Sequence, residues 1–131
     1  MQSVLVDSGF YINRLRAGAD PFQELNRFVG EYNFFTCGIV QVEVLRGIRN
    51  RTAFERTSEV MKSMFFLPTT DQILHQTLAL AWQLDRTGKV MQVTDLIIAA
   101  CALEAGACVL TLDRDFHHVP NLHVIHQLEL R

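Results

Sequence analysis

Short apolar runs constrain the fold of this chain more than any other feature of its sequence. Each run contains β-branched or aromatic residues and is bounded by polar or turn-forming residues. Strands with little alternation between apolar and polar residues are buried on both faces, as in a parallel sheet covered by helices. The runs predict strands over residues 3–6, 33–37, 107–112 and 122–126.

Segments with helical spacing lie between these runs. Asp20 precedes Pro21 and is followed by Gln23, which is a pattern typical of a helix start. Four more helices are expected. One begins near Gly38, and a second runs from a capping-box pattern at Thr52 to before Pro68. A third ends at Thr87-Gly88 and a fourth runs from Thr94 to Gly106; the apolar stripe of the third consists of Ile73, Leu74, Thr77, Leu78, Ala81 and Trp82.

This succession of strands and helices predicts an α/β fold. The expected architecture is a three-layer α/β/α domain with a mainly parallel central sheet. A chain of 131 residues that is 49% hydrophobic is long enough for one core and too short for two. No internal repeat or Pro/Gly/Ser-rich linker marks a boundary, so residues 1–131 are expected to form a single domain.

The sequence shows no sign of membrane insertion or secretion. No stretch approaches the roughly 20 apolar residues that span a bilayer, and the first residues lack the order of a signal peptide. We therefore expect a cytoplasmic protein. Cys37, Cys101 and Cys108 lie in apolar runs, which favours buried, reduced thiols over a disulfide framework or a zinc site.

The charge balance argues against a protein that coats nucleic acid by bulk attraction. The formal net charge is −2, whereas such proteins carry a basic excess. A local cluster of arginines, at positions 46, 49, 51 and 56, could still bind phosphates through paired hydrogen bonds. A solvated helix face explains the same cluster, so Arg46, Arg49 and Arg51 are candidate phosphate contacts only.

Acidic residues follow two of the predicted strands. Asp7 comes directly after the first strand, within Asp7-Ser8-Gly9, which predicts a turn. Asp113 follows the strand at 107–112, and Asp115 comes two residues later. In parallel sheets the carboxyl ends of the strands share one edge, where ligands bind. A turn residue or a helix cap is the structural alternative for Asp7.

Two further acids interrupt apolar helices. Glu43 shares a helical arc with Ile39, Val40 and Val44, where an uncompensated carboxylate would be costly. Asp95 lies in the first turn of the most apolar helix of the chain. An ion pair of Glu43 with Arg46 and a helix-dipole role for Asp95 are the structural alternatives.

Gathered carboxylates point to a hard divalent cation. Oxygen ligands suit Mg²⁺ or Mn²⁺ better than zinc, and without a cation the acids repel one another. Such an ion activates water and stabilises charge on a scissile phosphate. The histidines form no zinc-binding pattern, and His117-His118 is expected in a polar loop. No nucleophile elbow, phosphate-binding glycine loop or Cys-His motif competes with this interpretation.

As a whole, the sequence resembles the PIN-domain family, in particular the VapC-type toxins of toxin–antitoxin pairs. In that family the matching acids bind one or two Mg²⁺ ions and cleave RNA, and a hydroxyl at the position of Thr111 supports them. Gly9-Phe10 departs from the commonest pattern, and either Asp113 or Asp115 could be the fourth acid. The resemblance rests on Val4-Leu5-Val6-Asp7-Ser8, Val42-Glu43-Val44-Leu45-Arg46-Gly47, Asp95-Leu96-Ile97-Ile98-Ala99-Ala100 and Leu110-Thr111-Leu112-Asp113-Arg114-Asp115-Phe116, and it assigns the metal-binding and catalytic roles to Asp7, Glu43, Asp95 and Asp113.

The resemblance also implies partners. VapC-type proteins commonly form homodimers, and an antitoxin tail often inserts into the groove that leads to the site. Two other functions stay open. One is a binding module with the same fold and a silent site. The other is an aspartate phosphoacceptor at Asp7, which needs a lysine at a strand end, whereas Lys62 and Lys89 follow no predicted strand.

Overall fold

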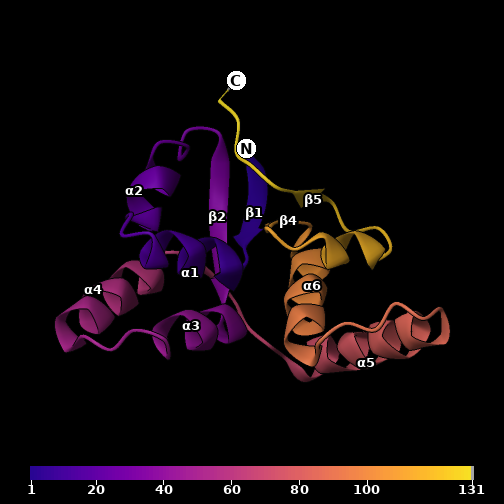
Figure 1. The fold of residues 1–131 in the computed structure, drawn as a ribbon. Helices are drawn as coiled ribbons and strands as arrows, with labels where there is room; N and C mark the ends of the chain where they lie inside the picture. The colour runs from indigo at the N-terminus through magenta and orange to yellow at the C-terminus, as the bar shows by residue number, and fades with distance from the viewer. Residues whose placement is uncertain (131) are drawn as a thin grey trace.

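Five parallel strands form the centre of the molecule (Figure 1). The computed structural model describes residues 1–130, and its strands lie in the order β3-β2-β1-β4-β5. Every strand pair within these residues is parallel, which confirms the α/β class and the parallel sheet. The strands are β1 (Gln2–Val6), β2 (Tyr32–Cys37), β3 (Phe65–Leu67), β4 (Cys108–Leu110) and β5 (Val124–Ile125).

Helices lie on both sides of the sheet. In Figure 1, α1 to α4 are gathered on one side of β1 and β2, and α5 and α6 lie on the other. The three-layer prediction is therefore confirmed. No helix among residues 1–130 has the length and apolar character needed to cross a membrane. The helices are α1 (Ser8–Arg16), α2 (Pro21–Asn26), α3 (Gly38–Leu45), α4 (Arg51–Lys62), α5 (Asp71–Arg86), α6 (Val93–Ala105) and the 3-10 helix η1 (Arg114–His118).

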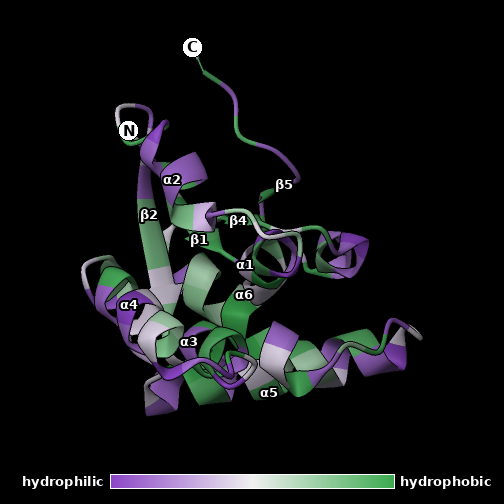
Figure 2. Ribbon diagram, turned by 60° about the vertical axis from the view of Figure 1, so that its left-hand side comes forward, coloured by the Kyte–Doolittle hydropathy of each residue, from purple (hydrophilic) through white to green (hydrophobic). Residues whose placement is uncertain are grey.

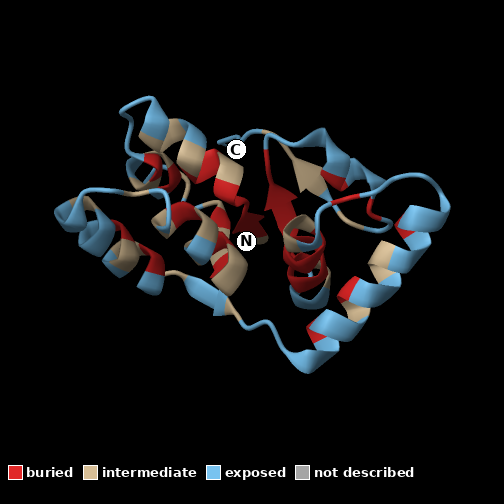
Figure 3. Cartoon of the chain, turned by 60° about the horizontal axis from the view of Figure 1, so that its bottom comes forward, coloured by how far each residue is buried: buried red, intermediate tan, exposed pale blue. Residues whose placement is uncertain are grey.

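The core is built around β1 and α6. Val4, Leu5 and Val6 of the central strand β1 are fully buried, because neighbouring strands flank it and helices cover its faces. Residues 96–102 of α6 are all buried as well. Figure 3 shows α6 as an almost continuous buried segment, and Figure 2 shows it as one of the most hydrophobic. Continuous burial thus explains the continuous apolar character of both segments.

Most predicted element boundaries agree with the structure. Asp20 caps α2, because its carboxylate accepts the backbone N–H groups of Phe22 and Gln23 at 3.0 and 3.3 Å. Gly106 ends α6 in the left-handed conformation with φ 65°, which a glycine adopts without steric cost. Helix α5 ends at Thr87 as expected. The three cysteines are buried free thiols, which confirms that prediction.

The turn predicted at Asp7-Ser8-Gly9 is wrong. These residues begin helix α1, with Asp7 as the N-cap. Tertiary contacts stabilise this short helix, since Phe10 is buried in the core. Arg14 also forms an ion pair of 2.9 Å with Glu24 of α2. Because these contacts come from the fold, the local sequence did not reveal the helix.

Other boundaries also differ from the prediction. The strands predicted over 107–112 and 122–126 are shorter in the structure, where they form β4 and β5. Helix α4 is capped by Asn50, whose side chain accepts the N–H of Ala53, and not by Thr52. That helix ends at Lys62, and the residues before Pro68 form the edge strand β3, which was not predicted. Helix α6 begins at Val93 after Gln92, so Thr94 is not its cap. In addition, His117 and His118 belong to the 3-10 helix η1 and not to a loop.

The apolar stripe predicted on α5 divides into two faces. Ile73 and Thr77 are buried, and the helix packs against α6. Leu74, Leu78 and Trp82 are exposed, with 70% of Leu78 and 61% of Trp82 accessible to solvent. We call these last three residues the α5 row. The stripe was predicted correctly as helical, but only part of it covers the core.

Candidate acidic active site

The acids predicted from the sequence come from four separate elements around the carboxyl edge of the sheet. Asp7 follows β1, and Asp113 lies shortly after β4. Glu43 lies in α3, which directly follows β2. Asp95 lies in the first turn of α6, and this helix leads back into the parallel strand β4. We call these residues, Asp7, Glu43, Asp95 and Asp113, the acidic edge.

Asp7 is the most buried member of the acidic edge, with 5% of its surface exposed. Its Oδ1 accepts the backbone N–H of Ser8 at 2.8 Å. Its Oδ2 accepts the hydroxyl of the fully buried Thr111 at 2.7 Å. A buried carboxylate needs such donors, because an unpaired one would cost several kcal/mol. The supporting role predicted for Thr111 therefore has a direct structural basis.

Hydrogen bonds extend from Asp7 to other acids on both sides. The Ser8 hydroxyl lies between two carboxylates, 3.1 Å from Oε1 of Glu43 and 3.4 Å from Oδ1 of Asp7, and its single hydrogen makes the shorter contact with Glu43. On the other side, Thr111 Oγ1 accepts the backbone N–H of Asp113 at 3.0 Å. Asp7 is thus linked through two hydroxyl residues to α3 and to the segment after β4.

The structure gives no support to the alternative partner of Glu43. Among residues 1–130, no ion pair joins Glu43 to Arg46. Glu43 is partly buried and instead accepts the Ser8 hydroxyl. The carboxylate therefore faces the acidic edge without a neutralising arginine.

Burial and mutual repulsion raise the pKa of two of the acids. For Asp7, desolvation raises the pKa, the hydrogen bonds from Thr111 and Ser8 oppose this, and the charges of Glu43 and Asp113 add to it. For Asp95, desolvation and then the charges of the neighbouring acids, beginning with Asp7, raise the pKa to about 6. Such perturbation is typical of functional sites, because it means that like charges have been brought together.

Asp113 and Asp115 differ in their relation to the other acids. The charge of Asp113 raises the pKa of both Asp7 and Asp95, whereas that of Asp115 affects only Asp95 and is the smallest cause there. The backbone N–H of Asp115 donates to Oδ1 of Asp113 at 2.8 Å, so Asp113 caps η1. These relations place Asp113 closer to the centre of the acidic edge and favour it as the fourth acid.

The donor set fits a hard cation in its chemistry. The acidic edge offers carboxylate oxygens, which are the ligands that Mg²⁺ and Mn²⁺ prefer. In the described part of the chain, however, no three side chains of the His, Cys, Asp or Glu type are arranged to hold one ion together. Repulsion keeps carboxylates apart when no cation lies between them. Ion binding would therefore require the side chains to rotate inwards.

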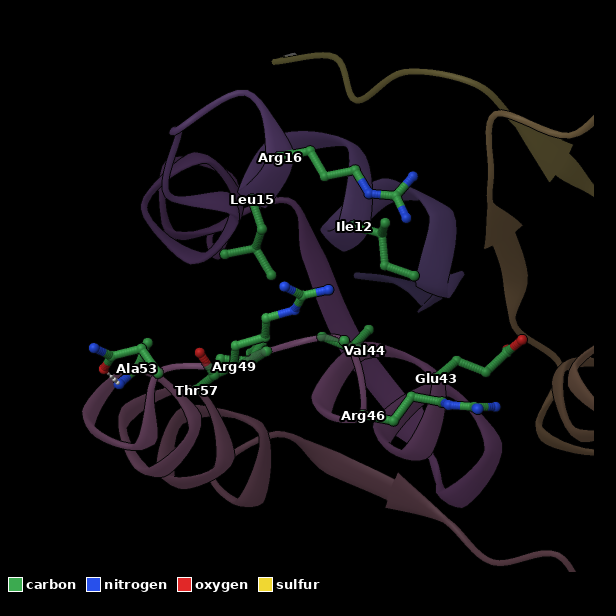
Figure 4. Close-up of a pocket in the computed structure, with 12 residues that line it drawn as sticks. Ile12, Leu15, Arg16, Glu43, Val44, Arg46, Arg49, Ala53 and Thr57 are labelled. Atoms are coloured by element: carbon green, nitrogen blue, oxygen red, sulfur yellow. Dashed lines mark hydrogen bonds between the residues drawn. The ribbon is translucent and has the colours of Figure 1, made fainter.

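A groove leads up to the acidic edge from one side. It encloses about 540 Å³ between α1, α3 and the start of α4, and Glu43 lies on its wall. Figure 4 shows Arg49 extending towards Leu15 of α1, and Arg46 extending in the same direction as Glu43. Arg16 of α1 is a third cation in the lining. We call this hollow, with its apolar floor and the three arginines Arg16, Arg46 and Arg49, the arginine groove.

The candidate phosphate contacts are not equivalent in the structure. Arg46 and Arg49 line the arginine groove, whereas Arg51 is not part of its lining. Arg51 is largely exposed and forms an ion pair of 3.2 Å with Glu55, one turn further along α4. The arginine cluster in the sequence therefore divides into a groove part and a solvated helix part.

Sequence reasoning missed two residues of this region. Ser8 connects Asp7 with Glu43, and Arg16 adds a cation to the arginine groove. The signal for Ser8 was present, because a serine directly after a strand-end acid can donate to neighbouring carboxylates. Arg16 carried no such signal, since its place in the groove depends on how α1 packs against α3.

A parallel α/β domain with a buried strand-end acid and further carboxylates at the same edge defines the class of this protein. The sequence comparison identifies the family, because residues 4–122 match the PIN domain. The chain belongs to the PIN-domain family, as its sequence pattern indicated. A comparison with curated proteins finds no match.

Solved structures show the same fold. The chain is similar to a chain of VapBC2 from Rickettsia felis bound to promoter DNA, with 16% identity, a TM-score of 0.79, and coverage of 95% of this chain and 98% of that one. It is also similar to a chain of DNA-bound VapBC from Salmonella typhimurium, with 21% identity, a TM-score of 0.77, and coverage of 95% of this chain and 98% of that one. A third similar structure is VapC20 from Mycobacterium tuberculosis, a toxin that cleaves the sarcin-ricin loop. The identity is 17%, the TM-score is 0.64, and the match covers 87% of this chain and 92% of that one.

Asp95 is expected to lower the stability of the metal-free protein at neutral pH. Its pKa rises from the ordinary value of 3.8 to about 6 in the folded state, so the folded state binds the proton more tightly. Stability is therefore lost as the pH rises from about 4 through about 6. In EDTA at pH 7.5, Asp95→Asn should raise the melting temperature by about 2–5 °C, because an amide carries no charge.

Calorimetry at several pH values checks this prediction. The gain from Asp95→Asn should shrink towards zero at pH 4, where the native carboxyl is already protonated. Asp85→Asn, on the exposed face of α5, is the matched control and should shift the melting temperature little at either pH. A gain from Asp95→Asn that is equally large at pH 4 would show that charge is not its cause.

Proposed function

We propose that this protein is a Mg²⁺-dependent endoribonuclease and the toxin of a type II toxin–antitoxin pair, acting in the cytoplasm. The gathering of like charges at the acidic edge carries the proposal, since a fold tolerates such repulsion mainly where a function requires it. Membership of the PIN-domain family and the fold shared with VapC20 and the VapBC chains support it. RNA is the proposed substrate, and water is the proposed nucleophile.

The residues of the acidic edge have distinct proposed roles. Asp7, held by Ser8 and Thr111, would be the fixed ligand, because both of its oxygens already have donors that limit rotation. Glu43, Asp95 and Asp113 would complete the ligand set from α3, α6 and the segment after β4. Bound Mg²⁺, or Mn²⁺ in its place, would supply a more acidic water molecule and positive charge for the scissile phosphate.

The structure disfavours a phosphoacceptor role for Asp7. Lys62 ends α4, and Lys89 lies after α5, so neither follows a strand at the acidic edge. A silent binding module is the remaining alternative, and the presence of all four acids argues against it.

Cleavage assays test the nuclease directly. The purified protein should cut single-stranded RNA with Mg²⁺ or Mn²⁺ and should stop when EDTA is added. Asp7→Asn and Asp95→Asn should each lower kcat at least about a hundredfold, because an amide is a weaker ligand and carries no charge. Asp85→Asn should retain wild-type activity. Activity that persists in EDTA, or in both acidic-edge variants, would contradict the assigned site.

The arginine groove is the proposed binding surface for both RNA and the antitoxin. Its arginines can bind phosphates or acidic side chains, and its apolar floor, which includes Ile12 and Val44, can bury apolar groups. A segment that lies in the groove reaches Glu43 and would cover the acidic edge. Competition between RNA and an antitoxin tail for this surface would explain inhibition without any change of fold.

Binding measurements with Asp7→Asn protein, which should not cut, test the groove. Arg46→Ala and Arg49→Ala should each weaken single-stranded RNA binding and reduce its salt dependence by about one counterion, as expected for lost phosphate contacts. Arg51→Ala, outside the groove, should have a smaller effect. A cognate antitoxin should displace RNA. Equal effects of the three substitutions, or an antitoxin and RNA bound together, would contradict a shared groove.

A second copy of the chain is the proposed partner of the α5 row. The row has no charged member and repeats every fourth residue along one helix, so two copies can pack against each other through the same surface. A shallow hollow beside Leu78 and Trp82, lined also by Ala79, could accept side chains of the other copy. The guanidinium of Arg86 lies over the Trp82 ring, 4.8 Å from its centre, at the end of the row. Charged RNA or an acidic tail would gain less there than in the arginine groove, which has three arginines.

Sedimentation analysis tests the dimer. The wild-type protein should sediment as a dimer, and Leu78→Glu should sediment as a monomer, because the interface would bury a charge in each copy. Val29→Glu is the matched control, since Val29 is also exposed, at 55%, but lies beyond the end of α2. A dimer that survives Leu78→Glu would show that another surface forms the contact.

A further inference from the structure

Two histidines from different elements, η1 and the segment after β5, meet near Thr111. Nε2 of His117, in η1, lies 2.7 Å from Nε2 of His126, which directly follows β5. The ring centres are 4.9 Å apart. The other ring nitrogen of His126, Nδ1, lies 2.7 Å from the carbonyl oxygen of Thr111. The proposed ligand set of the acidic edge uses neither histidine.

The contact with Thr111 decides which nitrogen of His126 carries the proton. A carbonyl oxygen can only accept, so Nδ1 of His126 must donate to it. Nε2 of a neutral His126 is then an acceptor, and Nε2 of His117 must donate. The result is a directed chain from His117 through His126 to Thr111. Each donor in such a chain strengthens the next one, which makes the orientation more definite.

Thr111 is the residue through which this chain reaches the acidic edge. Its hydroxyl donates to Asp7 at 2.7 Å and accepts the N–H of Asp113 at 3.0 Å. Its backbone N–H donates to the carbonyl of Ile125 at 3.1 Å, directly before His126. Ile125, the last residue of β5, and His126 directly after it thus hold both backbone polar groups of Thr111. Thr111 lies beyond the end of β4, where this pairing limits the rotation that would turn its hydroxyl away from Asp7.

We propose that His126 is a positioning residue of the acidic edge, which orients Thr111 and through it Asp7, and that His117 holds His126 in place. Donors that orient a ligand in this way tune metal sites in general, and their loss typically lowers metal affinity or activity about 10–100-fold. The effect on activity rests on the proposed nuclease function. The effect on the hydrogen bonds of Thr111 does not.

Variants of His126 separate positioning from simple packing. In His126→Asn, the side-chain NH₂ occupies about the place of Nδ1 and can still donate to Thr111. His126→Ala has no donor, and His126→Gln carries its NH₂ one atom further out. At pH 8, the His126→Ala and His126→Gln variants should each show Mn²⁺ affinity and kcat about tenfold lower than the wild type. The KM for RNA should stay unchanged, because the arginine groove is untouched, and Asn should stay within about twofold of wild type.

The neighbouring histidines supply the controls. His117→Ala should show a smaller loss than His126→Ala, because it acts through one more hydrogen bond. His118→Ala is the matched control, since His118 is exposed in the same 3-10 helix and should leave all values unchanged. If His126→Ala does not fold, the comparison of Asn with Gln decides the question, since both keep a polar side chain of similar size.

Amide hydrogen exchange at Asp113 gives a readout that does not depend on the nuclease. Its N–H donates to the Thr111 hydroxyl, so exchange should accelerate in His126→Ala and stay slow in His126→Asn. If the wild type neither binds Mn²⁺ nor cuts RNA, the proposed function fails and this exchange alone tests the positioning role. If the wild type is active, equal Mn²⁺ affinity and kcat in the Ala and Asn variants would overturn the proposal.

Discussion

Repulsion among carboxylates at the end of a parallel sheet is the constraint on which the site depends. Parallel strands necessarily bring their carboxyl ends to one edge, so acids that follow different strands approach one another. The Thr111 hydroxyl and the Ser8 amide make this tolerable at Asp7, because they stabilise its charged form. Asp95 has no comparable compensation, and its pKa rises to about 6 because of burial and its neighbours' charges. The site is therefore preorganised around one well-held acid.

The same hydrogen bonds connect the site to the rest of the fold. Ser8 links α1 with α3, while Thr111 links β1 with the segments on the other side of the sheet. Helix α6 has two roles, since its buried residues form the centre of the core and its first turn carries Asp95. Placing an acid at the start of such a helix exchanges stability for function, which is a common feature of active sites. The core and the candidate site are consequently not separable in this protein.

The two exposed surfaces of the molecule differ in a way that suits different partners. The arginine groove combines three cations with an apolar floor and opens next to Glu43, whereas the α5 row is apolar and uncharged. Electrostatic complementarity selects partners more strongly than apolar area does. A polyanion or an acidic tail therefore suits the groove, and an identical copy suits the row. The two proposed contacts are therefore compatible, since they use different surfaces of the molecule.

The sequence alone determined four of the five strands, the α/β class and the acids of the candidate site, because burial on both faces requires continuous apolar residues and each acid directly follows or interrupts such a segment. It did not reveal α1 or β3, because both elements depend on contacts with distant segments. Phe10 of α1 is buried by such contacts, and Phe65 of β3 pairs with Phe35 of β2. Nor could it show that His126 donates to Thr111, or that part of the predicted α5 stripe stays exposed. Local spacing specifies which residues share a helix or strand face, but which face is covered, and which side chains meet, depends on how the elements pack in three dimensions.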